Sequence, residues 1–159
     1  MGIFSDIPVR ANGDHVDASW WNTIRSKLIL FFGAGTIGET SVNLTNNQSS
    51  AASITGLIFA SATVKVAYID FRIRRYTTGG AGSELVAAGT LIAHYKAIAA
   101  TWYIGAIGVD GDTSVSTEGD VAGVVFSIDS SSGQVQYTTH NQAGSASESL
   151  IVFLARTMG

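Results

Sequence analysis

From residue 54 onward, the chain consists of short apolar segments that are rich in Val, Ile, Tyr and Phe and are separated by Gly, Ser, Asp or Asn. This pattern is typical of β-strands joined by turns, with no helix between them. In one long segment, Ile69, Phe71 and Ile73 alternate with Asp and Arg, which is the period of a strand with one buried face. Short strands at this spacing predict a mainly β protein, an antiparallel β-sandwich or jelly roll. The predicted strands are 54–59, 64–76, 85–96, 101–109, 121–128, 134–139 and 150–155.

Two local features are predicted within these strands. Val64 and Val66 have the opposite parity to Ile69, so a β-bulge is expected near Ala67 or Tyr68. The serines and glycine of residues 130–133 separate two apolar segments, and they predict a hairpin turn.

The region before the strands is predicted to contain one amphipathic α-helix, over residues 17–32. Asp17 is the expected N-cap, and Gly33 follows the last apolar residue as the expected C-cap. Between them, large apolar residues recur at spacings of three and four, as on one face of a helix. These residues are Trp20, Trp21, Ile24, Leu28 and Phe31.

Three parts of the chain follow from these patterns. Residues 1–32 form an N-terminal segment with the helix, and residues 54–159 form the β domain. The residues between them, 33–53, are mostly Gly, Thr, Asn, Gln and Ser, which predicts a linker with at most one brief strand.

The chain has few charges: 13% of its residues are charged, where about 25% is usual, and its mean hydropathy is +0.27. Interface cores are depleted in charge, so we expect part of the surface to be buried against copies of the chain or another protein. The net charge of -3 disfavours nucleic acid as a partner. With no cysteine, disulfides, thiolate zinc sites and cysteine nucleophiles are excluded. The apolar run Leu28–Phe32 is too short to span a bilayer, so no membrane insertion is expected.

Two motifs are candidates for ligand binding. Residues 33–38 match the spacing G-x-G-x-x-G, but a turn-rich segment follows where a dinucleotide site needs a helix, and residues 53–57 lack the required acid. The acidic stretch Asp110–Asp120 departs from the EF-hand pattern, because Val115 stands where that loop needs glycine. A solvated loop is favoured there, and an irregular cation site is left open.

The sequence has few residues in the patterns that form catalytic or metal-binding sites. His15, His94 and His140 are far apart and have no partner at metal-ligand spacing, so no metal site and no cofactor are expected. A Ser/His/Asp triad depends on geometry alone, and the chain has no G-x-S-x-G elbow. The residues therefore give no positive sign of catalysis, and a small hydrolase based on scattered Asp, Ser and His is left open.

A basic cluster lies in the second predicted strand. Arg72 and Arg74 share one face of this strand, and Arg75 points to the other. They are suited to bind acids of a neighbouring subunit bidentately, or else they line a solvated face.

Two aromatic groups are candidate binding residues. Tyr95, Trp102 and Tyr103 are a candidate glycan-stacking platform, although alternation favours core packing for one member of the Trp102–Tyr103 pair. The Trp20–Trp21 pair needs a partner surface, which is either another protein or the chain's own sandwich.

Residues 7–25, IPVRANGDHVDASWWNTIR, resemble the N-terminal segment of virion appendage proteins of tailed bacteriophages, in which a Pro, a Gly, a small residue and a W-N-x-[IL]-R helix recur. Residues 125–139, VFSIDSSSGQVQYTT, are similar to a hairpin near the end of phage fibre and head-fibre proteins. The resemblance implies a non-enzymatic homotrimer in the virion, assembled in the host cytoplasm and attached by its N-terminal segment to other virion proteins. The implied docking residues are Pro8, Arg10, Trp20, Trp21, Asn22, Ile24, Arg25 and Leu28.

The chain lacks the repetitive shaft of longer, host-recognising tail fibres. The resemblance therefore implies a short tail fibre, adaptor or fibre-like appendage. A capsid decoration or head-fibre protein is one alternative. Another is a carbohydrate-binding β-sandwich module whose partner is a host surface glycan.

Overall fold

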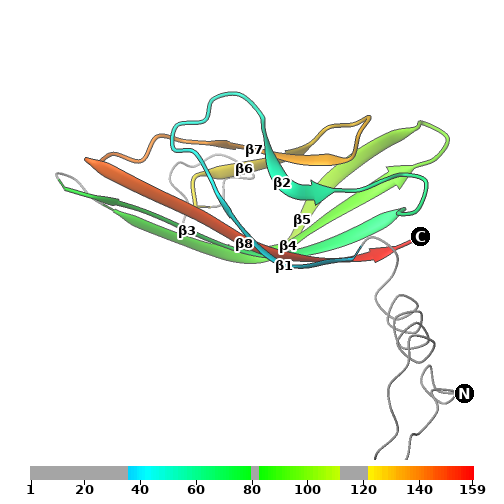
Figure 1. Cartoon of the computed structure of the whole chain (residues 1–159), viewed down its shortest axis with the longest axis horizontal. Coiled ribbons are helices and arrows are strands. Elements are labelled where there is room, and N and C mark those ends of the chain that lie inside the picture. Colours follow the sequence, from blue (N-terminus) through cyan, green and yellow to red (C-terminus); the bar gives the residue numbers. More distant parts are fainter. Residues whose placement is uncertain (1–35, 80–82, 112–121) are drawn as a thin grey trace, which may run out of the picture.

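The computed structural model describes residues 36–79, 83–111 and 122–159, which form two antiparallel β-sheets (Figure 1). The predicted helix over 17–32 and all eight predicted docking residues lie outside the described residues, and so does most of the acidic stretch Asp110–Asp120. No α-helix occurs in the described ranges, and so none there is long and apolar enough to cross a membrane.

The two sheets are the layers of a sandwich, which confirms the predicted antiparallel β architecture. The larger sheet has the strand order β1-β8-β3-β4-β5, and the smaller has the order β2-β7-β6. Figure 1 shows the larger sheet curving beneath the smaller one. The strands are β1 (Ile37–Asn43), β2 (Ala52–Ile58), β3 (Val66–Thr78), β4 (Glu84–Lys96), β5 (Thr101–Gly111), β6 (Val124–Ile128), β7 (Gln134–Thr139) and β8 (Ala146–Met158).

The hydrophobic core lies between the sheets. Ile69, Phe71 and Ile73 are buried, as their alternation in β3 predicts. Val135 of β7 is also buried, and the ring of Phe126 in β6 meets that of Phe71 edge-on, with the centroids 5.1 Å apart. Each buried large apolar side chain stabilises the fold by about 1.5–3 kcal/mol, so this layer holds the sheets together.

Trp102 of β5 fills one end of the core. Its ring centroid lies 6.1 Å from that of Phe59 and 5.3 Å from that of Tyr95. Gly133, after the β6–β7 turn, closes over this cluster with a φ of +73°. A Cβ there would lie 2.4 Å from the Phe59 carbonyl oxygen and 2.7 Å from Trp102 Nε1, so only glycine fits without movement.

The bulge predicted near Ala67 or Tyr68 is wrong. β3 pairs with β8 from Val66 to Thr78 without a register shift. Val64 lies before the strand, in a turn in which its N–H donates to the Ala60 carbonyl at 2.9 Å. The turn carries Val64 into the core, and this accounts for its parity.

The segment predicted as a linker, residues 33–53, contains a strand. β1 lies in the segment predicted as a linker and pairs with β8, and Leu44 after it joins the core. Because β1 is an edge strand, Glu39, Ser41 and Asn43 are exposed, and the strand therefore has the polar composition of a linker.

Arg75 ties the two sheets together from a fully buried position. Its Nη1 donates to the carbonyls of Ala122 at 3.0 Å and Gly123 at 2.9 Å. Its Nη2 donates at 2.8 Å to Asn46 Oδ1 and to the His140 carbonyl. With a further bond from Nε to Ser149 Oγ at 3.2 Å, all five guanidinium N–H groups have acceptors. Arg75 thus points to the face opposite Arg72 and Arg74, as predicted.

The predicted hairpin over residues 130–133 is confirmed, and Asp129 organises it. The N–H of Gly133 donates to the Asp129 carbonyl at 3.0 Å. The Asp129 carboxylate accepts a 2.8 Å bond from the backbone N–H of Ser132, and it also accepts the hydroxyls of Ser131 and Ser132. These bonds, that of the Ser132 backbone first, lower the pKa of Asp129 from 3.8 to about 2.

Candidate interaction surface

The larger sheet has a second face, turned away from the smaller sheet, which we call the outer face. Of the seven exposed large hydrophobic side chains in the described residues, five lie on it: Val86, Tyr103, Ile107, Leu154 and Met158. The face includes Glu39 of β1, Tyr68, Asp70, Arg72 and Arg74 of β3, Val86, Thr90 and Ile92 of β4, Tyr103 and Ile107 of β5, and Leu150, Val152, Leu154, Arg156 and Met158 of β8. Glu84, His94 and Lys96 of β4 lie on it as well.

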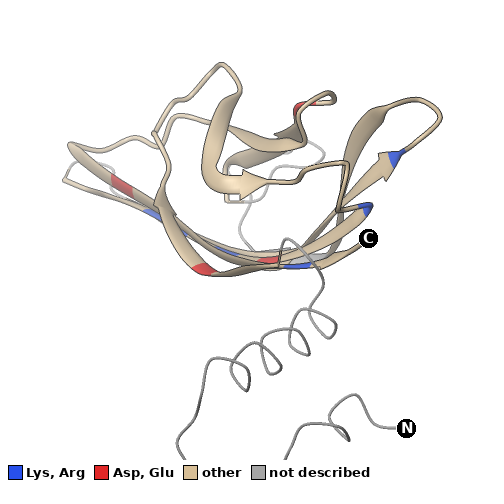
Figure 2. Cartoon of the chain, turned by 45° about the vertical axis from the view of Figure 1, so that its right-hand side comes forward, with Lys and Arg blue, Asp and Glu red and all other residues tan. Residues whose placement is uncertain are grey.

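The smaller sheet presents a different surface. Its three strands carry no charged residue, and the positions of β7 that alternate with the core are Gln134, Gln136 and Thr138. In Figure 2 the coloured, charged residues accordingly lie mostly along the larger sheet. The outer face of the larger sheet thus combines apolar and charged side chains, whereas this strand of the smaller sheet turns uncharged polar groups outward.

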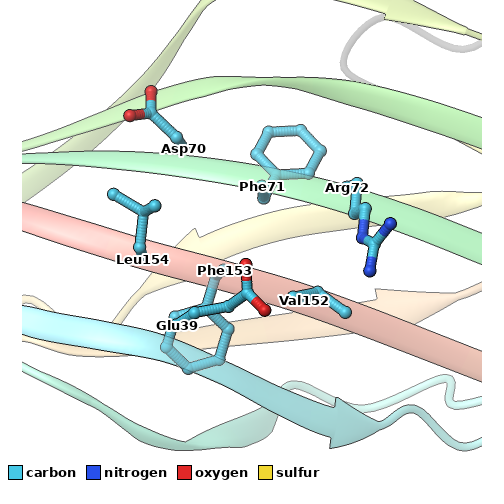
Figure 3. A pocket seen from close by; sticks show the side chains of 7 residues that line it. All are labelled: Glu39, Asp70, Phe71, Arg72, Val152, Phe153 and Leu154. Atoms are coloured by element: carbon cyan, nitrogen blue, oxygen red, sulfur yellow. The ribbon is translucent and has the colours of Figure 1, made fainter.

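Two hollows mark the centre of the outer face. One, of about 340 Å³, is lined by Arg72, Ile73, Arg74, Val86, Leu150 and Val152. The other, of about 200 Å³, is lined by Glu39, Asp70, Phe71, Arg72, Val152, Phe153 and Leu154 (Figure 3). Both include Arg72 and Val152, which are directly opposed in the β3–β8 register. The hollows therefore lie on either side of this pair and form one trough along the two strands.

Charged groups flank the trough, and most are paired. Arg74 Nε lies 2.6 Å from a carboxylate oxygen of Glu84, and Arg156 Nη2 lies 3.2 Å from one of Asp70. The hydroxyl of Thr90 donates to the other Asp70 oxygen at 2.6 Å. These exposed pairs orient their side chains but add little stability.

Arg72 and Glu39 differ from these pairs. Neither makes an ion pair within the part of the chain that the structure describes. They come from β3 and β1, the two strands that flank β8, and Figure 3 shows both side chains reaching over the Val152 region. Among the described residues, a cation and an anion without an ion pair therefore lie on either side of an apolar floor.

The candidate glycan residues do not form one platform. Trp102 is 2% exposed and packs in the core, so its ring is not accessible to a ligand in this conformation. Tyr95 pairs with Trp102 and is partly buried on the same face. Tyr103 points to the outer face, where its ring stacks on His94 and lies 4.3 Å beneath Lys96 Nζ.

Within the described residues, no three His, Asp or Glu side chains group in a way that could hold a metal ion. His94 lies on the outer face of β4, whereas the carbonyl of His140 accepts a bond from Arg75 near the core. The two histidines are therefore on different parts of the fold.

The apolar outer face is not among the features predicted from the sequence, although a signal for it is present. Residues 150–154 read Leu-Ile-Val-Phe-Leu, so both parities of β8 are apolar. Such a run is typical of a strand that is buried on both faces. The run predicts a strand, and its lack of alternation is the sign of a second apolar face.

Comparison with known proteins gives a distant structural likeness. No family model matches the chain, and no curated protein matches it. Among solved structures, it is similar to the tailspike protein of Acinetobacter phage vB_ApiP_P1, with a TM-score of 0.49 and 17% sequence identity. The match covers 76% of this chain but 22% of the tailspike chain.

Proposed function

We propose that this chain is a structural, non-enzymatic component of a bacteriophage virion. It is a short tail fibre, adaptor or fibre-like appendage that attaches to other virion proteins through residues 1–32 and assembles as a homotrimer through its β domain.

The assembly part of this proposal is supported by one structural observation, the apolar outer face. A patch that holds most of the exposed large hydrophobic side chains is typical of a surface that another protein covers. The low charged fraction, 13%, agrees with a chain that leaves less surface to water than a free monomer does.

The virion part is supported by the sequence of the N-terminal segment. Residues 7–25 resemble the attachment segments of phage appendage proteins, and Trp20 and Trp21 begin a predicted helix whose apolar face needs a partner. Tryptophan is among the residues that most often dominate binding energy at protein interfaces.

Incorporation into particles tests this proposal. The Trp20→Ala, Trp21→Ala double variant of the full chain replaces the native chain in the encoding phage, and the copies per purified particle are measured by quantitative immunoblot. We expect incorporation to fall at least about tenfold, since loss of one anchoring tryptophan typically costs about 2 kcal/mol or more.

The control is Ile98→Ala, a change at a fully exposed position in the β4–β5 hairpin, which should be incorporated normally. Circular dichroism of both variants should show an unchanged β domain. Normal incorporation of the double tryptophan variant would rule out the N-terminal attachment.

A further inference from the structure

We propose that copies of this chain associate through the outer face of the larger sheet, burying Val86, Ile107 and Leu154 of each copy against a neighbour. This inference rests on the proposed assembly through the β domain, and it names the surface that performs the assembly.

The first argument is that β8 has more apolar surface than one copy uses. Ile151 and Phe153 face the smaller sheet and are buried in the core. Leu150, Val152 and Leu154 have the opposite parity and point away from it. Val152 is already buried by its neighbours, Leu150 is half-buried and Leu154 is exposed. An antiparallel sheet with one face on the core usually turns polar residues to water on the other. A second apolar row is expected where a second layer covers the sheet.

The second argument is the size of the face. Strands β3, β4, β5 and β8 have 11 to 13 residues. At about 3.3 Å per residue and 4.8 Å between strands, the face of the five-stranded sheet measures roughly 800 Å². A specific protein interface buries about 800 Å² on each partner. The face as a whole therefore offers the area that a stable interface needs, and in a trimer two neighbouring copies share it.

The third argument is that the face is complementary to itself in charge. Arg72 and Glu39 lie on the two sides of Val152 and have no ion-pair partner in the described ranges. In a symmetric assembly, the guanidinium of Arg72 is placed to meet the Glu39 carboxylate of the neighbouring copy. A bidentate pair of this kind fixes orientation as well as adding attraction.

The test compares the mass of the full chain and its variants by size-exclusion chromatography with light scattering over a dilution series. The native chain is expected at three times the monomer mass of 16.6 kDa. Leu154→Glu and Ile107→Glu place a charge on the outer face, and both should dissociate at concentrations at least about tenfold higher than the native chain. Two positions are tested so that a folding defect at one of them does not decide the result. Ile107 is already 57% exposed, so a charge at this position should leave the fold intact.

The matched control is Ile98→Glu, which introduces the same charge at a fully exposed isoleucine in the turn between β4 and β5. It should associate like the native chain. Association that is unchanged in both outer-face variants would overturn this inference and leave the proposed assembly standing. A native chain that is monomeric at all concentrations would overturn both.

A second experiment tests the Arg72–Glu39 contact directly. Arg72→Glu alone and Glu39→Arg alone should each weaken association, because each creates like charges across the contact. The double variant Arg72→Glu, Glu39→Arg should restore it, because every contact between copies then again joins opposite charges. Failure of the double variant to recover association would overturn the assigned contact.

The rival occupant of the face is the chain's own segment 17–32. Because the protein has no cysteine, a Leu154→Cys variant can be labelled at a single site with a maleimide. Labelling that is slow in the assembled state and fast after dilution to monomer supports a neighbouring copy. Equally slow labelling in the monomer, relieved by Trp20→Ala and Trp21→Ala, would assign the face to that segment and overturn the inference.

Discussion

Replacing Gly133 by alanine tests how the β6–β7 hairpin is seated against the core. Gly133 has a φ of +73°, and a Cβ there would lie 2.4 Å from the carbonyl oxygen of Phe59 and 2.7 Å from Nε1 of Trp102. Both neighbours are large groups inside the packed end of the sandwich. The hairpin or the Trp102 ring must therefore move to admit a methyl group.

The expected loss of stability has two parts. A residue other than glycine in the left-handed region costs about 1–2 kcal/mol. Overpacking a well-packed site costs typically about 1–3 kcal/mol more. Gly133→Ala should thus lower the free energy of unfolding by about 2–5 kcal/mol. That is a large part of the roughly 5–15 kcal/mol available to a typical domain.

Gly56 provides the matched control. It also has a positive φ, +84°, but a Cβ added there would have no atom within 4 Å. Gly56→Ala should therefore cost only the backbone part, about 1–2 kcal/mol. Urea unfolding of the full-length variants at one protein concentration, followed by far-UV circular dichroism, measures the difference. Equal losses at the two glycines would refute the steric reasoning.

Two further predictions concern polar groups that hold the fold. Arg75→Lys keeps the positive charge but has three donors in place of the five of the guanidinium. It should lower the free energy of unfolding by about 3 kcal/mol or more. A variant that unfolds like the native chain would contradict the role of Arg75 in joining the two sheets. Asp129 has its pKa lowered from 3.8 to about 2, so its carboxylate stabilises the hairpin above about pH 4, and this stabilisation is lost as the pH falls toward 2. The difference in urea midpoint between the native chain and Asp129→Asn should shrink over that range, and a difference independent of pH would contradict the assignment.

Much of the sandwich is predictable because strand signals are local. The β6–β7 turn and the alternation of β3 depend on neighbouring residues, and both are confirmed by the structure. β1 is only partly predictable, because an edge strand with three exposed polar side chains has the composition of a loop. The prediction of a bulge in β3 is wrong because alternation assigns residues to a face only within one continuous strand. β3 begins at Val66, so Val64 lies before the strand.

The functional surface is harder to predict. The resemblance of residues 7–25 directs attention to the N-terminal segment, whereas the outer face depends on five strands that are brought together from distant parts of the chain. Trp102 and Tyr103 illustrate the same limit. Alternation separates them onto two faces, but only the sheet order shows that Trp102 is the one that lies in the core.

Local pattern in this chain is enough to establish the strand class, the hairpin at 130–133 and the opposite orientations of Arg74 and Arg75. Those properties depend on periods and turn chemistry that span a few residues. The pairing of β8 between β1 and β3 and the five acceptors of Arg75 require the folded chain. So does the apolar row that β8 turns away from the core. These three features arise from contacts between residues that are many positions apart in the sequence. The free energy of such contacts depends on which strands become neighbours in the sheet.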